Sequence, residues 1–321
     1  MIIWGMSGKG HDASVTVWGP NKITGLPTLL YENYTRNKRH NKSEIKKLLR
    51  YGKPDRIVWY EKPFKKALRM LYAGQEKPFK RNRIKSYLKD LCDFPLPKCV
   101  YINHHEAHAA HFYDSPFKEA LIFVIDSIGE WDCTSVWKGK SYSGHLVKLD
   151  SVSYPDSLGL WYSSMTKAAG LKPNSDEGTF ESLYDESQLD EFALRAVEKY
   201  IMPHEWRPMF WKNLHRGVGD SLPGPKKFTP IEIATATQFA FSQKVTKMIT
   251  HWCEKEQINN VVLAGGCAFN KSVRKDITDL GFNLWVPNNP GDGGSAKSCV
   301  NAYLRKKALV DISLNQGPFH S

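Results

Sequence analysis

From residue 121 to residue 137 the chain reads Leu121-Ile122-Phe123-Val124-Ile125-Asp126-Ser127-Ile128-Gly129-Glu130-Trp131-Asp132-Cys133-Thr134-Ser135-Val136-Trp137. An apolar strand leads into a turn of glycine and acidic residues and a second strand leads out, which is typical of a β-hairpin with a polar tip. The same pattern occurs near the N-terminus, where residues 2–4 precede the polar turn 5–12 and the strand 13–18. Two such hairpins predict a duplicated architecture, although strand–turn–strand units are common enough for a chance repeat.

The rest of the chain alternates between apolar strands and helical patterns. Further strands are predicted at residues 56–60, 99–103, 261–264 and 282–286, and helices at 44–51, 65–73, 80–91, 159–169 and 231–255. This alternation predicts an α/β fold with central sheets. The segment 204–230, rich in Pro, Gly, Trp and Lys, is predicted to be an irregular surface excursion.

Length and composition exclude several classes of protein. With 321 residues, 41% of them hydrophobic, the chain can bury a large core and has room for two packed lobes. No run approaches the ~18 apolar residues of a transmembrane helix, and the first residues lack the basic start of a secretory signal. The six cysteines form no CxxC pair, which favours reduced thiols over a disulfide or zinc framework. We therefore expect a cytoplasmic protein without a membrane partner.

The positive charge is concentrated in one segment. The chain has 45 Lys and Arg against 33 Asp and Glu, and residues 36–98 alone hold 20 basic and 6 acidic side chains. Such a segment is either a solvated lysine-rich face or a surface for a polyanion such as nucleic acid. Charge alone does not distinguish these two interpretations.

The densest chemical pattern, directly after a predicted strand, is Asn103-His104-His105-Glu106-Ala107-His108-Ala109-Ala110-His111. If a helix begins here, His104 and His108 share one face, one turn apart, and can chelate one divalent ion. Asp126, which closes the strand 121–125, and Asp292, in a glycine loop, are the natural candidates for the remaining ligands. Two histidines with carboxylates and open coordination positions suit iron, manganese or zinc, and the pattern does not choose among them.

Two glycine loops suggest a nucleotide site. Residues 264–270 (Ala264-Gly265-Gly266-Cys267-Ala268-Phe269-Asn270) lie between a predicted strand and a predicted helix, where paired glycines let backbone amides approach a phosphate. Such a junction can also be only a tight connection, but the second loop at 290–295 favours the nucleotide interpretation. The pairs Asp176-Glu177 and Glu61-Lys62 are predicted from spacing alone to be solvated loop residues.

Taken in order, these motifs resemble the O-carbamoyltransferase family of antibiotic and nodulation-factor biosynthesis. That family shares its catalytic domain with hydrogenase-maturation carbamoyltransferases and the tRNA threonylcarbamoyl synthase. The matching segments cover nearly the whole chain, at residues 11–14, 32–38, 60–63, 104–110, 126–130, 157–163, 176–178, 264–270 and 290–296. The resemblance implies a two-lobed α/β fold of the actin and heat-shock-chaperone type (ASKHA), a nucleotide-binding fold whose duplicated β-hairpins face the phosphates. We expect the lobes to be residues 1–118 and 119–321.

The resemblance also implies roles for particular residues. It places a divalent metal, Fe²⁺ in preference to Mn²⁺ or Zn²⁺, on His104, His108, Asp126 and Asp292. It brings His11 and Lys38 to the transferred group, and His11 or Asp12 is the expected general base. ATP or carbamoyl adenylate is expected to contact Gly265, Gly266, Asn270, Gly293 and Glu177, although residues 179–182 depart from the family's sequence after the motif that contains Glu177.

The implied activity is metal-dependent O-carbamoyl transfer from carbamoyl adenylate, made from carbamoyl phosphate and ATP, to a hydroxyl acceptor. Relatives that make carbamoyl adenylate carry a second, YrdC-like domain after this one, and this chain stops soon after Leu304. We therefore expect a separate YrdC-like subunit and a heteromeric assembly, or else a different mode of action for the lobe pair.

The basic segment bears on the acceptor. A hydroxymethylated pyrimidine in DNA or in a nucleotide, as in viral DNA modification, accounts for a concentration of Lys and Arg that a small sugar does not. Because residues 36–98 lie apart in sequence from the metal motif and the C-terminal glycine loops, we expect them to form a docking surface for DNA or for the partner subunit. The alternatives are O-carbamoylation of a small molecule or sugar, and a non-catalytic nucleotide-binding scaffold subunit.

Overall fold

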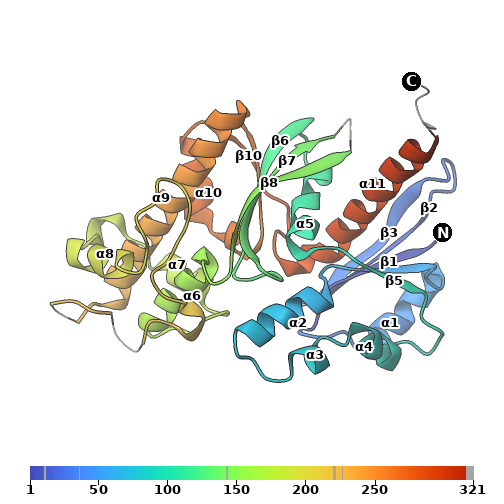
Figure 1. Cartoon of the computed structure of the whole chain (residues 1–321), viewed down its shortest axis with the longest axis horizontal. Helices are drawn as coiled ribbons and strands as arrows, with labels where there is room; N and C mark the ends of the chain where they lie inside the picture. Colours follow the sequence, from blue (N-terminus) through green and yellow to red (C-terminus); the bar gives the residue numbers. More distant parts are fainter. Residues whose placement is uncertain (11, 36, 142–143, 220–221, 226, 316–321) are drawn as a thin grey trace.

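The computed structural model describes the whole chain except residues 11, 36, 142–143, 220–221, 226 and 316–321. It contains two five-stranded sheets with helices around them, in two lobes that lie side by side (Figure 1). The first lobe, with helices α1 to α4, is on the right in Figure 1, and the second, with α6 to α10, is on the left. None of the helices in the described part of the chain has the length and apolarity needed to cross a membrane.

The first sheet has the strand order β3-β2-β1-β4-β5. Its central strand β1 (Ile3–Met6) pairs antiparallel with β2 (Ser14–Pro20), and β2 pairs antiparallel with β3 (Pro27–Tyr34). On the other side β1 pairs in parallel with β4 (Arg56–Trp59), and β4 pairs in parallel with β5 (Lys98–Tyr101). All four residues of β1 are buried, as expected for a central strand covered on both faces.

The second sheet repeats this arrangement. Its order, β8-β7-β6-β9-β10, has β6 (Glu119–Ile125) in the central place of β1. β6 pairs antiparallel with β7 (Asp132–Lys140), and β7 with β8 (His145–Ser153). On its other side β6 pairs in parallel with β9 (Asn260–Ala264), and β9 with β10 (Asn283–Trp285). Order and directions match the first sheet strand for strand, so the predicted hairpins and their duplication are confirmed.

Helices α1 and α2 begin at signals present in the sequence. The Asn41 side chain accepts a hydrogen bond from the backbone N–H of Glu44, whose carboxylate accepts one in return from the backbone of Asn41. This reciprocal cap satisfies two unpaired donors at the start of α1 (Lys42–Leu48). Helix α2 (Pro63–Tyr72) begins with proline, whose fixed φ and missing N–H suit the first helical position.

The single helix predicted at 80–91 is wrong. The structure has two helices here, α3 (Pro78–Arg81) and α4 (Ile84–Leu91). The side-chain amide of Asn82 donates to the carbonyl of Pro78 at 2.8 Å and caps the short first helix. The periodicity of apolar residues continues across this break, which is why the pattern alone did not reveal it.

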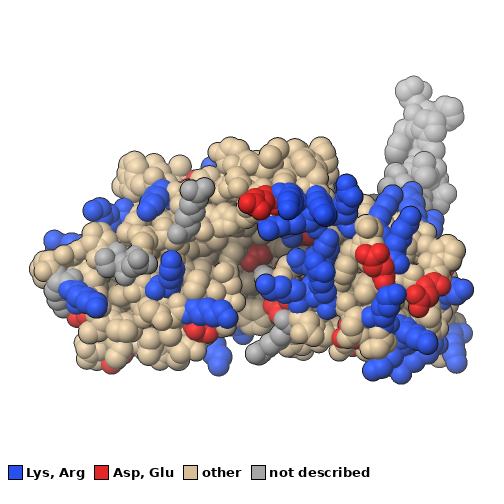
Figure 2. All heavy atoms as spheres, turned by 90° about the horizontal axis from the view of Figure 1, so that it is seen from below, with Lys and Arg blue, Asp and Glu red and all other residues tan. Residues whose placement is uncertain are grey.

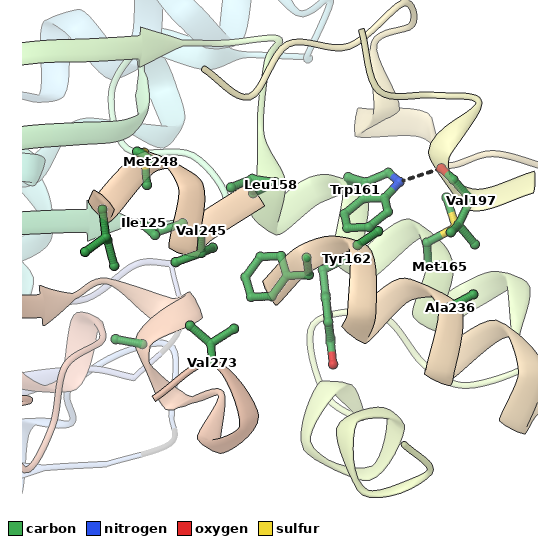
Figure 3. Packing of buried hydrophobic residues seen from close by; sticks show 14 of the residues in the cluster. Ile125, Leu158, Trp161, Tyr162, Met165, Val197, Ala236, Val245, Met248 and Val273 are labelled. Carbon is green, nitrogen blue, oxygen red and sulfur yellow. Dashed lines mark hydrogen bonds between the residues drawn. The ribbon is translucent and has the colours of Figure 1, made fainter. Parts of the chain in front are cut away.

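The second lobe is mainly helical around its sheet. Its longest helix, α9, begins with a reciprocal cap between Thr229 and Glu232. Figure 3 shows α6 residues, among them Trp161, packed against α9 residues such as Val245, with the Trp161 indole N–H donating to the Val197 carbonyl at 3.3 Å. The helices of this lobe are α6 (Leu158–Ala168), α7 (Glu177–Ser182), α8 (Glu191–Glu198), α9 (Pro230–Glu256) and α10 (Lys271–Asp279).

Two helices connect the lobes. Helix α5 (His104–Ala109) follows β5 and contacts strand β6 of the second sheet and helix α11. Helix α11 (Ser295–Asn315) returns to the first sheet, where Cys299 and Val300 belong to the same buried cluster as Trp4. The division of the lobes at residues 118 and 119 stays a prediction, and α11 packs with the strands that come before it.

The described residues of the segment 204–230 are irregular, as predicted, but they are not only a surface excursion. Phe210, Leu214 and Phe228 are at most 8% exposed and belong to the core of the second lobe. The composition in Pro and Gly indicated correctly that regular structure is interrupted here. It did not indicate that the apolar residues between the turns fold back onto α6 and α9.

Candidate metal centre and interlobe cleft

Helix α5 holds two histidines whose ring nitrogens face each other. The Asn103 side chain accepts a hydrogen bond from the backbone N–H of Glu106, which starts the helix immediately after β5. His104 and His108 are one turn apart and so lie on one face. Their Nε2 atoms are 3.1 Å apart. The structure therefore brings these two predicted ligands together.

Two carboxylates from distant segments meet this pair. Asp126 follows the last residue of β6, and Asp292 begins the short 3-10 helix Asp292–Gly294. The Nε2 atom of His104 is 3.0 Å from Asp126 Oδ2 and 3.5 Å from Asp292 Oδ1. The Nε2 atom of His108 is 3.7 Å and 3.3 Å from the same two oxygens. All four donor atoms lie within 4.8 Å of one another, and we call these four residues the metal cluster.

The metal cluster is buried and electrostatically coupled. None of its members is more than 9% exposed. Burial by itself lowers the pKa of His104, but the charges of Asp292 and Asp126 outweigh it and raise the pKa to about 9. Burial likewise opposes ionisation of Asp126, and His104 nevertheless holds the pKa of this carboxyl well below its usual range. The two carboxylates thus favour a positive charge between them.

The residues of the metal cluster fit a divalent cation. Metal bonds of about 2.0–2.2 Å to nitrogen and oxygen keep two ligand atoms within roughly 4.4 Å of each other. The five distances that involve a histidine nitrogen, from 3.0 to 3.7 Å, fall within this limit. Two imidazoles and two carboxylates suit Fe²⁺, Mn²⁺ or Zn²⁺ and leave coordination positions for a substrate.

The other two histidines of the motif lie outside the metal cluster. His105 turns away, with its Nδ1 atom 2.7 Å from Ser135 Oγ, and burial lowers its pKa well below the usual value. His111 lies against Gly294, and burial together with the charge of His108 lowers its pKa to about 3. Both rings are therefore neutral at ordinary pH and pack in the interior.

A buried carboxylate in the second hairpin, Glu130, fixes the position of α5. Its Oε1 atom accepts hydrogen bonds from the backbone N–H groups of His104, at 3.2 Å, and Lys62. Its Oε2 atom accepts one from the side-chain amide of Asn103 at 2.6 Å. Lys62 and His104 stand at the starts of α2 and α5, where N–H groups lack helical partners and the helix dipole favours an anion. The second lobe thereby positions two helices that follow strands of the first sheet.

A cleft of about 480 Å³ lies beside the metal cluster. Both hairpin turns line it, together with α2, α6 and the segment around Leu214, and His104 and Asp292 form part of its wall. Figure 2 shows a hollow between the two halves of the molecule. The metal cluster is therefore accessible from the cleft between the lobes.

Four cationic side chains line the cleft: Lys9, Lys66, Arg69 and Lys167. Lys66 and Arg69 belong to the basic segment 36–98, so the expectation that this segment lies apart from the metal motif is wrong for them. Helix α2 begins at Pro63 and turns residues three and four positions apart to one side, here the cleft. Lys66 also pairs at 2.7 Å with Glu61, which is 1% exposed and not the solvated loop residue predicted from spacing.

Tyr60 belongs to the matching segment 60–63 but was given no role from the sequence; it stands directly after strand β4. Its hydroxyl donates to Asp292 Oδ2 at 3.4 Å, and its ring centroid is 5.3 Å from that of His104. Burial, with the charge of Asp292, raises its pKa well above the usual value, so the phenol stays protonated. The signal for this role in the sequence was the position of a polar side chain at the carboxyl end of a predicted strand.

The three residues predicted for catalysis have different outcomes. His11 lies outside the described residues. Asp12 is partly buried in the first hairpin turn, at a φ of +48°. The Lys38 side chain is exposed, and its carbonyl accepts a hydrogen bond from the backbone N–H of Lys9 at 2.6 Å. Within the described part of the chain it is Lys9, rather than Lys38, that lines the cleft, and the catalytic roles stay predictions.

The predicted nucleotide glycines lie next to the metal cluster. Gly265, at a φ of +90°, donates its N–H to the Pro290 carbonyl at 2.8 Å, which joins the two glycine loops. A Cβ on Gly266 would come within 3.0 Å of Asp126 Oδ1. A Cβ on Gly293 would come equally close to the Tyr34 ring. These close approaches explain why glycine occupies the loops.

Asn270 and Glu177 form internal hydrogen bonds. The Asn270 amide caps α10 through Val273 N–H and exchanges hydrogen bonds with Gln238 of α9 at 2.8 and 3.2 Å. Glu177 accepts from Ser163 Oγ at 2.7 Å and from the backbone N–H of Asn174. Both side chains hold helices together near the cleft, and their contacts with a nucleotide stay predictions.

The residues that form this site lie in a part of the chain that matches a known protein family. The family model described as Carbamoyltransferase N-terminus matches residues 60–299. The chain belongs to this family. The matched range contains the whole metal cluster and Glu130, so the family resemblance drawn from the motifs is confirmed.

Relatives of this carbamoyltransferase-family chain are longer proteins. It is 27% identical to the uncharacterized protein sll1178 of Synechocystis sp., over 96% of this chain and 58% of that protein. It is also 27% identical to the uncharacterized protein MJ1051 of Methanocaldococcus jannaschii, over 97% of this chain and 58% of that protein. The chain thus spans 58% of the length of each relative.

A solved structure of full-length HypF, in its phosphate- and nucleotide-bound form, has a similar fold. The TM-score is 0.56 at 13% identity, over 95% of this chain and 55% of HypF. Together with the duplicated sheets, this likeness confirms the expected two-lobed α/β fold of the actin and heat-shock-chaperone type.

Proposed function

We propose that this chain transfers a carbamoyl group from carbamoyl adenylate to a hydroxyl acceptor in the cleft between its lobes. The observation that carries the proposal is the metal cluster. In a chain of the carbamoyltransferase family, two imidazoles and two carboxylates converge at the wall of a cleft of about 480 Å³. A non-catalytic scaffold has no need of such a buried set of charged donors, because burying charges costs free energy unless they have a function or a partner.

In this proposal His104, His108, Asp126 and Asp292 hold a divalent cation. Fe²⁺ is preferred to Mn²⁺ or Zn²⁺ on the family resemblance. The bound cation would supply Lewis-acid stabilisation of the charge that develops on the leaving phosphate. Glu130 fixes the backbone at His104, and Tyr60, which also lines the cleft, donates a hydrogen bond to Asp292, so both residues orient ligands.

In the proposed step the carbamoyl group passes from AMP to the acceptor oxygen. The acceptor oxygen forms a bond to the carbamoyl carbon, and the bond from that carbon to the phosphate oxygen breaks. AMP leaves with the electron pair, and a base takes the acceptor proton. Lys66, Arg69 and Lys167 line the cleft and would stabilise the negative charge on AMP. His11 or Asp12 is the proposed base, and Lys38 is proposed to approach the transferred group.

The donor nucleotide is proposed to rest on the glycine loops. Gly265, Gly266 and Gly293 present backbone without side chains beside the metal cluster, and Asn270 and Glu177 are proposed to contribute further contacts. The nucleotide-bound state of HypF supports this assignment by fold alone. We propose that a YrdC-like unit outside the two described lobes makes the carbamoyl adenylate from carbamoyl phosphate and ATP.

The proposed acceptor is a hydroxymethylated pyrimidine in DNA or in a nucleotide. The basic segment 36–98 supports it, since its Lys66 and Arg69 reach the cleft. Phosphates attract such a surface and release counterions when they bind. A small sugar acceptor offers no partner for this charge.

The experiment is an assay with synthetic carbamoyl adenylate. The protein, loaded with each of the three candidate metals in turn, is incubated with the donor and a hydroxymethylated pyrimidine nucleoside, and the products are identified by mass spectrometry. We expect a carbamoylated nucleoside and one AMP for each transfer. Release of AMP without any carbamoylated nucleoside, with water as the acceptor, would contradict the proposed acceptor.

A further inference from the structure

Helix α2 exposes an apolar stripe to solvent. Phe64, Leu68, Leu71 and Tyr72 are 66%, 38%, 56% and 69% exposed. They stand at positions i, i+4, i+7 and i+8, so they share one face of the helix. Phe79 of α3, also exposed, extends the stripe, with its ring centroid 6.1 Å from that of Phe64. In a soluble protein such a face is normally covered, so these five residues, the α2 stripe, need an occupant.

The α2 stripe comes closest to the cleft at the C-terminal end of the helix. Lys66, Arg69 and Met70, on the opposite face of the same helix, line the cleft. At the C-terminal end of the helix, the Tyr72 ring lies 5.6 Å from the ring of Trp131 in the second hairpin turn. Eight residues separate Phe64 from Tyr72, which is about 12 Å along a helix. A ligand bound along the stripe would therefore end beside the second hairpin, whose turn lines the cleft.

The surroundings of the stripe are strongly basic. Residues 62–89 contain ten Lys or Arg and a single acidic residue, Glu76. Of these ten, Lys66 alone is ion-paired within the described part of the chain, and Lys80 and Arg81 are exposed beside Phe79. Figure 2 shows basic side chains gathered beside the hollow, on the half of the molecule formed by the first lobe. Exposed cationic side chains and exposed rings thus lie together on α2 and α3.

We infer that the α2 stripe and its basic neighbours bind single-stranded nucleic acid and lead one nucleotide into the cleft. The inference rests on the proposed function, for which it identifies the acceptor's docking surface. Exposed rings stack on the flat faces of unpaired bases, while lysines and arginines follow the phosphates. A duplex hides its base faces inside the helix, so it matches only the charge. An acidic protein likewise matches the charge but does not need two pairs of exposed rings, one of them at the hairpin beside the cleft.

The test is binding of a fluorescent oligonucleotide, measured by anisotropy at low salt. The probe is a single-stranded DNA of about 20 nucleotides, long enough to cover one such surface. Phe64→Ala with Phe79→Ala removes one ring pair, and Phe192→Ala, at an exposed position of α8 in the second lobe, is its matched control. Lys80→Glu with Arg81→Glu reverses two charges, and Lys199→Glu with Lys212→Glu makes the same change at exposed sites of the second lobe.

We expect the Kd to rise more than about tenfold in the double Phe variant, because each stacked base contributes about 1–3 kcal/mol. Lys80→Glu with Arg81→Glu should also weaken binding. Both control variants should have a Kd within about twofold of that of the unmodified protein. Equal binding by the double Phe variant and its control, equally tight binding of the duplex, or no binding at low salt would each overturn the inference. The last outcome would assign the basic surface to a protein partner.

This assay is independent of carbamoyl transfer. A protein that binds the oligonucleotide as described but transfers no carbamoyl group would contradict only the proposed function. A protein that carbamoylates a free nucleoside but binds no single strand would contradict only the docking surface.

Discussion

Glu130, in the second hairpin, accepts a hydrogen bond at 3.2 Å from the backbone N–H of His104, the first residue of α5. The same carboxylate bonds to the backbone of Lys62 and to the amide of Asn103. One buried group of the second lobe thus sets the position of the helix that carries both imidazoles of the metal cluster. This contact couples the stability of the fold to the geometry of the site.

Replacement of Glu130 should therefore affect both stability and metal binding. In Glu130→Ala two backbone donors and one amide lose their acceptor, and we expect the free energy of unfolding to fall by about 3 kcal/mol. Metal affinity should fall about 10- to 100-fold, as for other residues that orient ligands. Urea titration and metal titration measure the two effects. Glu76→Ala, at an exposed site, is the control, and equal stability of the two variants would contradict this role.

The tight approach at Gly265 gives a second prediction. A Cβ here would lie 2.4 Å from the Ile125 carbonyl oxygen, and the residue has a φ of +90°. Gly281 has a φ of +86° with open space around it, so Gly281→Ala isolates the conformational cost of about 1 kcal/mol. Gly265→Ala should destabilise the protein by at least about 2 kcal/mol more, measured by chemical denaturation. Equal losses would mean that the loop yields without strain.

One experiment can separate the structural role of the Asn270 amide from its proposed role in nucleotide binding. Its hydrogen bonds to Val273 and Gln238 predict that Asn270→Ala lowers the free energy of unfolding by about 2 kcal/mol, even without nucleotide. Asn288→Ala, at an exposed loop position, should change it by less than about 0.5 kcal/mol. Thermal unfolding in the absence and presence of ADP measures this. An effect that appears only with nucleotide would contradict a structural role for the amide.

Much of this arrangement follows from local sequence patterns. The two hairpins and the strand order they imply follow from the two-residue period of strands. The pairing of His104 with His108 follows from the three- to four-residue period of a helix. Both periods depend only on residues close together in the sequence. Asp126 could be predicted because it ends a strand whose partner strands also end at the site. Asp292 could be predicted from its glycine loop.

Other features depend on contacts between distant segments and were not predictable in this way. Glu61 lies in a polar stretch that looks solvated, but it is buried and its carboxylate pairs with Lys66 of α2. Lys66 and Arg69 belong to a long basic run, and their turn toward the cleft depends on how α2 is oriented. Glu130 has no distinctive local pattern, because its partners are backbone groups of two helices far away in the sequence.

A cation in the cleft should contribute to donor binding. Lys167 lines the cleft from α6 and has an exposed side chain, so its replacement costs little stability. We expect Lys167→Gln to raise the KM for carbamoyl adenylate about three- to tenfold, an effect that decreases as salt is added. Steady-state kinetics at two ionic strengths measure this. Lys172→Gln, exposed in the same lobe and outside the cleft lining, is the control, and identical KM values for both variants would exclude the role.

The metal cluster itself gives the strongest mutational prediction. His108→Ala removes one of four converging ligands, and we expect loss of bound metal and a fall in carbamoyl transfer of more than about 100-fold. Metal analysis of the purified protein and single-turnover assays with carbamoyl adenylate measure the two quantities. His251→Ala, on α9 away from the cleft, should keep both. Unchanged turnover and metal content in His108→Ala would contradict the assignment.

The most direct test of metal-dependent carbamoyl transfer in the cleft uses the unmodified chain. Bound metal is removed with a chelator, and transfer from carbamoyl adenylate to a hydroxymethylated pyrimidine nucleoside is measured before and after Fe²⁺, Mn²⁺ or Zn²⁺ is added back. The account predicts that the metal-free protein stays folded, loses transfer, and regains it with at least one of the three ions. Transfer at an undiminished rate by folded protein that metal analysis shows to be metal-free would contradict it.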